Sequence, residues 1–146
     1  MSLATDRIFI AALKSNAELL SMLGGTGTTQ PRLYGIAITM PDEDIDNVPV
    51  PYAIVTFDSL TNDVESKDDS YESDEDTVNI GIELTAKSLN ELHTLTQKVR
   101  DTVLGYLHAN DTDIVEYTFS ADAIQYDSLK PCFWQVLRYQ CQVINS

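Results

Sequence analysis

The chain has 146 residues, of which 23 are acidic and nine are basic, and its formal net charge is −14. One hydrophobic core suffices at this length, and an apolar content of 43% is ordinary for a globular protein, so we expect one domain over residues 1–146. A surface this acidic repels phosphates, which excludes nucleic-acid binding by affinity. Because the sequence shows neither a secretory signal nor an apolar run of membrane-spanning length, we expect a soluble, non-exported protein without a membrane partner.

Residues 6–23 are helical in character, but a Ser-x-x-Glu capping box at Ser15 and Glu18 interrupts them. The pattern predicts two short helices with a break near Ser15. Gly24 and Gly25 follow the second helix and are typical of a helix end. This glycine-rich stretch follows a helix and contains no lysine, so we do not interpret it as a phosphate-binding loop.

The middle of the chain combines weak strand signals with acidic loops. Residues 32–39 are β-like but irregular, and residues 41–51 predict an exposed acidic loop between prolines. Residues 52–60 predict a strand with apolar side chains on both faces, which favours a central place in a sheet.

Residues 61–76 contain eight acidic side chains and a single lysine, and we interpret them as a long solvated loop. The acidic residues are Asp63, Glu65, Asp68, Asp69, Glu72, Asp74, Glu75 and Asp76. Ca²⁺ prefers carboxylate oxygens, but the segment lacks the alternating ligands and central glycine of an EF-hand loop, so we assign no metal ligands. Loops of this length are often functional, which makes these residues candidates for contact with a partner.

The clearest pattern follows this loop. Val78, Ile80, Ile82 and Leu84 alternate with polar residues, which predicts a strand with one buried face. Ser88 and Glu91 then form a second capping box, and a helix follows in which apolar residues recur at spacings of three and four. Those residues are Leu92, Leu95, Val99, Val103 and Tyr106. Strand and helix are each roughly 30 Å long, so the helix can cover the strand.

Two further strands are predicted at residues 114–124 and 132–144, with a turn at residues 126–131 between them. The inward-facing residues are predicted to be Val115, Tyr117, Phe119 and Ala121 in the first strand, and Leu137, Tyr139, Cys141 and Val143 in the second. The sequence therefore predicts an α+β fold in which a mixed, mostly antiparallel sheet has helices packed on one face.

Few residues are of types that carry out chemistry. Cys132 and Cys141 lie on opposite faces of one predicted strand, roughly 30 Å apart, so they cannot form a disulfide and are expected to be buried and reduced. His93 and His108 belong to no catalytic or metal-binding motif. Trp134 is interpreted as a core or interface residue. We therefore expect no enzyme, and no catalytic, cofactor-binding or metal-binding residues.

The order of these features resembles small phage tail-terminator and tail-completion proteins. The likeness is carried by the two N-terminal helices ending in Leu19-Leu20-Ser21-Met22-Leu23-Gly24, by the strands opening at Val50-Pro51-Tyr52 and Asp76-Thr77-Val78, by the helix containing Val99-Arg100, and by the final strand. It spans nearly the whole chain. The acidic segment 61–76 and the loop 41–49 are longer than the usual connections of that family.

The resemblance implies a structural virion protein of a phage or prophage, made in the host bacterial cytoplasm. It implies a homo-oligomeric ring, with six subunits as the habit of the family, that terminates the tail tube and joins it to head–tail connector proteins, without a cofactor. The alternative is a stand-alone acidic binding module without catalysis, whose acidic segment recruits a cation or a basic protein.

Overall fold

A computed structural model describes residues 2–35, 49–62 and 75–144. In chain order the elements are η1 (Ser2–Ala4), α1 (Thr5–Lys14), α2 (Ala17–Met22), β1 (Leu33–Gly35), β2 (Tyr52–Thr61), β3 (Glu75–Ala86), α3 (Leu89–Ala109), β4 (Ile114–Ala121), β5 (Gln125–Asp127) and β6 (Cys132–Ile144). Among these residues no helix is long and apolar enough to cross a membrane.

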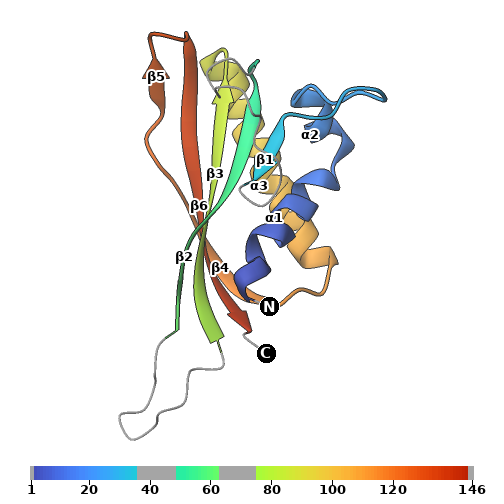
Figure 1. Ribbon diagram of the computed structural model, residues 1–146, viewed down its shortest axis with the longest axis vertical. Coiled ribbons are helices and arrows are strands. Elements are labelled where there is room, and N and C mark those ends of the chain that lie inside the picture. The colour runs from blue at the N-terminus through green and yellow to red at the C-terminus, as the bar shows by residue number, and fades with distance from the viewer. Residues whose placement is uncertain (1, 36–48, 63–74, 145–146) are drawn as a thin grey trace, which may run out of the picture.

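The strands form one six-stranded sheet in the order β1-β2-β3-β6-β4, and β5 also pairs with β6. β1 runs parallel to β2, whereas every other pairing is antiparallel. The three α-helices lie together on one side of the sheet, and α3 runs along the length of the long strands (Figure 1). The predicted α+β fold is therefore confirmed, and β2 lies between two neighbouring strands as expected.

The hydrophobic core lies between the sheet and the helices. Its largest contributors from β3 are the four predicted inward residues Val78, Ile80, Ile82 and Leu84, all fully buried. Burial of one such side chain is worth about 1.5–3 kcal/mol, so this strand alone contributes several kcal/mol. α3 supplies the facing layer with its fully buried Leu92, Leu95, Val99 and Val103, as predicted, while Tyr106 is only half-buried.

The start of α3 follows the predicted capping box with one difference. The Ser88 side chain accepts a hydrogen bond from the backbone N–H of Glu91 at 3.1 Å. In the usual reciprocal bond the glutamate accepts from the capping residue itself, but here Glu91 Oε1 accepts the N–H of Lys87 at 3.1 Å. The first bond satisfies a backbone N–H that the first helical turn leaves unpaired, and the second ties the residue before the cap to the helix.

The two N-terminal helices and their break are confirmed, but the capping residue of α2 was predicted wrongly. Asn16 caps α2, and its side-chain oxygen accepts the N–H groups of Glu18 and Leu19. Ser15 instead donates its hydroxyl to the Ala12 carbonyl of α1. Gly24 ends this unit with a φ of 83°, a left-handed conformation that favours glycine.

The predicted acidic loop is shorter than its charge pattern suggests. β2 extends to Thr61 and β3 begins at Glu75, so the last two acidic residues of the segment belong to a strand. Asp76 is only 6% exposed, and it accepts a hydrogen bond from Asn62 Nδ2 at 2.7 Å. Most of the predicted loop 41–51 and part of the β-like segment 32–39 lie outside the described residues.

The C-terminal strands differ from the prediction at the start of β4 and in the turn. A register shift between Ile114 and Glu116 leaves Val115 without a partner in β6, so Val115 is 55% exposed rather than inward. Tyr117 and Phe119 are half-buried against the core, while Ala121 at the strand end is exposed. β4 ends at Ala121 rather than at residue 124, the short strand β5 overlaps the start of the predicted turn, and the actual turn is confined to residues 128–131.

β6 has the predicted inward face, with Leu137, Tyr139, Cys141 and Val143 buried. Both cysteines are free and buried, as predicted. Burial raises the pKa of the Cys141 thiol to about 12, so this thiol stays protonated and unreactive.

Candidate functional site

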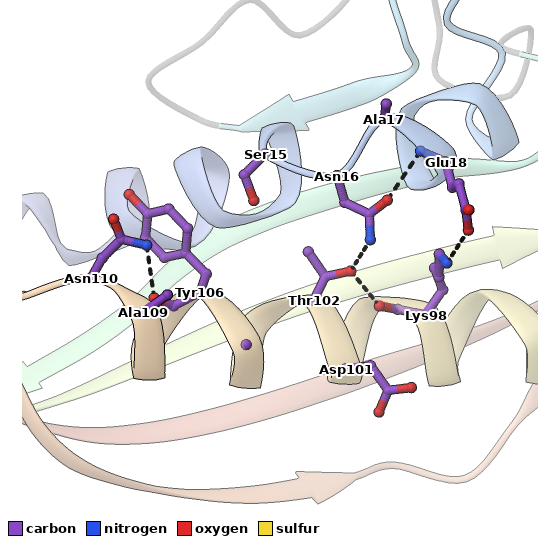
Figure 2. A pocket seen from close by; sticks show the side chains of 11 residues that line it. Ser15, Asn16, Ala17, Glu18, Lys98, Asp101, Thr102, Tyr106, Ala109 and Asn110 are labelled. Atoms are coloured by element: carbon purple, nitrogen blue, oxygen red, sulfur yellow. Dashed lines mark hydrogen bonds and ion pairs between the residues drawn. The ribbon is translucent and has the colours of Figure 1, made fainter.

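A groove of about 690 Å³ lies between the α1–α2 junction and α3 (Figure 2). Asn16 lies at its centre. Its side-chain oxygen caps α2, and its Nδ2 donates to Thr102 Oγ1 at 2.9 Å. Thr102 in turn donates to the Lys98 carbonyl at 2.6 Å. This chain of bonds ties the break between the short helices to the middle of α3.

Other polar groups of the groove are also paired. Lys98 forms an ion pair with Glu18, and this partner lowers the pKa of the Glu18 carboxyl. Asn110 donates to the Tyr106 carbonyl at 3.0 Å, which satisfies a backbone group at the end of α3. Because these side chains hold the helices in place, we interpret the groove as a structural seam of the helical layer.

A second hollow lies on the sheet face opposite the helices. It has a volume of about 200 Å³ and is lined by Tyr52, Glu83, Thr85, Asp127, Lys130, Cys132 and Trp134. The strand register places Tyr52 and Trp134 on either side of Thr85, and it places Glu83 two residues along the same face. The turn after β5 brings Lys130 over the Tyr52 ring, with its Nζ 5.5 Å from the ring centroid. We call this hollow the open-face pocket.

Glu83 is the unusual residue of the open-face pocket. Its neighbours across the sheet are Ile54 of β2 and Val136 of β6. Burial beside these apolar side chains raises the pKa of the Glu83 carboxyl. Among the residues that the structure describes, none forms a hydrogen bond or ion pair with it. Asp127, by contrast, accepts two backbone N–H groups of its own turn.

The edges of the sheet form a third candidate surface. β4 pairs only with β6 among the described strands, so its other side is an edge. Val115 lies exposed at the bulge of this edge strand. At the opposite edge, β1 pairs with β2 only as far as Val55 in the described residues, so the rest of β2 has no described partner on that side. An edge strand presents unpaired backbone groups to which another chain can add.

The structure describes three of the candidate residues named from the sequence. Asp63, Glu65, Asp68, Asp69, Glu72 and Asp74 lie outside the described residues. Glu75 is exposed at the start of β3, whereas Asp76 is buried and hydrogen-bonded. Trp134 lines the open-face pocket. It lies on β6 beside Thr85, near the C-terminal end of β3, whereas Asp76 lies near the N-terminal end of β3. The three described candidates therefore do not form one site.

Tyr52, Glu83 and Lys130 were not among the candidates from the sequence. Glu83 belongs to the polar side of an alternating strand, where a glutamate is expected to face water. Its apolar surroundings come from β2 and β6, which are distant in sequence. A weak signal existed, because Tyr52 and Ile54 give the central strand β2 a second apolar face that something must cover.

The histidines and the other metal-ligating residues form no cluster in the described ranges. His93 faces a shallow hollow on α3 beside Thr94, Gln97, Lys98 and Asp101. His108 lies in the last turn of α3, where a basic residue suits the helix dipole. No group of three or more His, Cys, Asp or Glu side chains in residues 2–35, 49–62 and 75–144 is arranged to hold a metal ion.

Comparisons with known proteins give a likeness of fold. No protein-family model matches the sequence, and no curated protein matches it either. A chain in a solved structure, described as the virion of a native gene transfer agent particle, has a similar fold with a TM-score of 0.62. The likeness covers 96% of this chain and 94% of that chain at 11% sequence identity. At this identity, the comparison shows a shared fold.

Proposed function

We propose that this chain is a structural virion assembly protein of a phage or prophage tail. Its role is to form a homo-oligomeric ring, of six subunits by the habit of the family it resembles, that terminates the tail tube and joins it to the head or neck. It carries out no catalysis and needs no cofactor. The observation that carries the proposal is the fold shared with a virion chain over nearly the full length of both chains.

The arrangement of the sheet supports ring formation. The edge at β4 and the edge at β1 and the end of β2 lie on opposite sides of the sheet. A contact between two different surfaces of identical subunits is heterologous, and such contacts close into rings when the rotation permits. Edge-to-edge contact also covers Val115, an exposed apolar residue on the outermost strand.

A substitution at this edge tests the ring directly. Val115→Lys places a charge on the edge strand, a device that blocks edge pairing, and should shift native mass spectra from a ring to the monomer. Leu104→Lys is the matched control, because Leu104 is 43% exposed and belongs to α3 rather than to an edge strand. A ring that survives Val115→Lys would exclude contact through this edge, and a wild-type monomer that also ignores tail-tube protein would contradict the proposed function.

The acidic segment has a separate role in the proposal, either in docking to a partner or in facing the DNA channel, where like charge keeps DNA from sticking. Replacing residues 63–74 with a short turn should weaken docking to the tail and leave the fold intact. The deletion stops before Glu75, because Asp76 is buried and bonded to Asn62. Circular dichroism checks the fold, and tail joining that is unchanged would contradict this role.

The runner-up function is a stand-alone binding module for a cation or a basic protein. It is favoured by one observation: the Glu83 carboxylate lines a pocket on the face of the sheet without helices and has no partner among the described residues. A protein that remains monomeric and gains thermal stability on addition of Ca²⁺ would support the cation-binding form of this function against the ring.

A further inference from the structure

The open-face pocket has the size of a site for one side chain. Its volume of about 200 Å³ is smaller than the roughly 300–1,000 Å³ typical of pockets for small-molecule ligands. Tyr52 and Trp134 supply aromatic surfaces at its sides, and Glu83 and Thr85 come from the strand between them. A flat or elongated group that enters between the aromatic rings therefore meets a carboxylate.

The charges of the pocket specify a cation. Glu83 and Asp127 supply two carboxylates to its lining, and Lys130 supplies one ammonium group. Asp127 accepts the backbone N–H groups of Leu129 and Lys130 and so holds its own turn. Glu83 forms no bond within the described residues, and its desolvated carboxylate is costly until a cation or donor reaches it.

We propose that the open-face pocket binds an arginine side chain of a basic partner protein, with the guanidinium on the Glu83 carboxylate and its plane against Trp134. Arginine fits better than lysine because its planar group binds carboxylates with two parallel hydrogen bonds and stacks on aromatic rings. The chain already pairs its own cations with aromatic rings, since Lys130 lies over Tyr52 and the Arg100 guanidinium lies 4.4 Å from the Phe119 centroid.

Charge favours a different protein over a second copy as the source of the arginine. This chain carries 23 acidic and nine basic residues, so two copies repel each other except where specific contacts prevail. A partner with a basic surface is attracted by the same field and can insert an arginine at the pocket. The assignment does not depend on whether the chain forms a ring.

Trp134 provides the readout, because it is the only tryptophan of the chain and it lines the pocket. The full-length protein is titrated with N-acetyl-arginine amide while Trp134 fluorescence and the NMR signal of its indole N–H are followed. N-acetyl-citrulline amide is the matched probe, since it keeps the shape of arginine and lacks the charge. We expect saturable binding of the arginine probe, weakened by salt, and no binding of the citrulline probe.

Two variants separate the pocket from general acidity. Glu83→Gln should weaken binding of the arginine probe at least tenfold, because it removes the charged acceptor and keeps the shape. Glu116→Gln removes one negative charge from exposed β4 and should leave binding unchanged. Equal binding of both probes, an unchanged affinity in Glu83→Gln, or no NMR shift of the indole with the arginine probe would overturn the proposal. Native mass spectrometry of Glu83→Gln measures ring formation separately. The arginine-binding proposal can therefore fail without contradicting the proposed ring, and the reverse also holds.

Discussion

The two faces of the sheet differ in how far their side chains are covered by the rest of the chain. On the helix-covered face, Ile82 and its neighbours pack into one continuous core against α1 and α3. On the open face, Tyr52 and Ile54 form a small separate cluster with Tyr34 and Val50. The helix-covered face is completed by the chain itself, whereas the open face contains a carboxylate without a partner among the described residues. The fold therefore depends on one face, and the other face is where recognition is expected.

The largest predicted difference between the faces is in the stability lost when a large apolar side chain is truncated. Ile82→Ala should lower the free energy of unfolding by about 3–5 kcal/mol, because a fully buried core side chain leaves a cavity that rigid neighbours cannot fill. Ile54→Ala is the matched substitution on the open face and should cost about half as much, since its small cluster can collapse around the gap. Urea denaturation measures both values, and equal losses would contradict the comparison.

The next effect tests the helical layer that covers the core. Asn16→Ala removes the cap of α2 and the bond to Thr102, so it should cost about 1–2 kcal/mol. Ser15→Ala removes only a bond to the Ala12 carbonyl and should cost less than about 0.5 kcal/mol. If thermal or chemical denaturation showed a larger loss of stability for Ser15→Ala than for Asn16→Ala, Ser15 would be the capping residue, as predicted from the sequence.

These adjacent residues show where local sequence patterns stop being informative. β3 and α3 were predictable because each repeats one period over many residues, and the repeated side chains form the core. Ser15 and Asn16 are both good capping residues, and the choice depends on Thr102, which is far along the chain. Only the tertiary contact selects Asn16.

The errors at the other elements have the same origin. The charge of residues 61–76 suggested a loop throughout, but Asp76 pairs with Asn62 once β2 and β3 are in register. The exposure of Val115 follows from a bulge relative to β6, which no alternation within β4 reveals. The apolar surroundings of Glu83 likewise come from Ile54 and Val136 on other strands. The elements were thus predictable, whereas the candidate site depended on their register.

A smaller effect, an increase in stability, is predicted for a substitution inside the core. Tyr139 is buried among Phe9, Tyr117 and Phe119, and its hydroxyl has no hydrogen-bond partner in the described part of the chain. Burial raises the pKa of this hydroxyl, so it remains neutral at all ordinary pH values. Tyr139→Phe removes an unsatisfied polar atom and should stabilise the fold by up to about 1 kcal/mol in urea denaturation. A clear loss of stability would show that the hydroxyl is bonded in solution.

The smallest predicted effect links stability on the open face to pH. Burial raises the pKa of Glu83 in the folded state, so the folded protein binds a proton more readily than the unfolded chain does. The contribution of this group to stability is therefore intact below the unfolded pKa and falls as pH rises through the folded pKa. Glu83→Gln removes this dependence, because an amide does not titrate.

The variant should accordingly match the wild type under acid conditions and become the more stable of the two as the carboxyl ionises. Thermal unfolding of both proteins across the acid range measures the difference, and Glu116→Gln on exposed β4 controls for the change in net charge. A constant difference at every pH would mean that the Glu83 carboxyl is solvated. Saturating N-acetyl-arginine amide should then remove the advantage of the variant at neutral pH, because a bound guanidinium offsets the cost of the buried charge in the wild type alone.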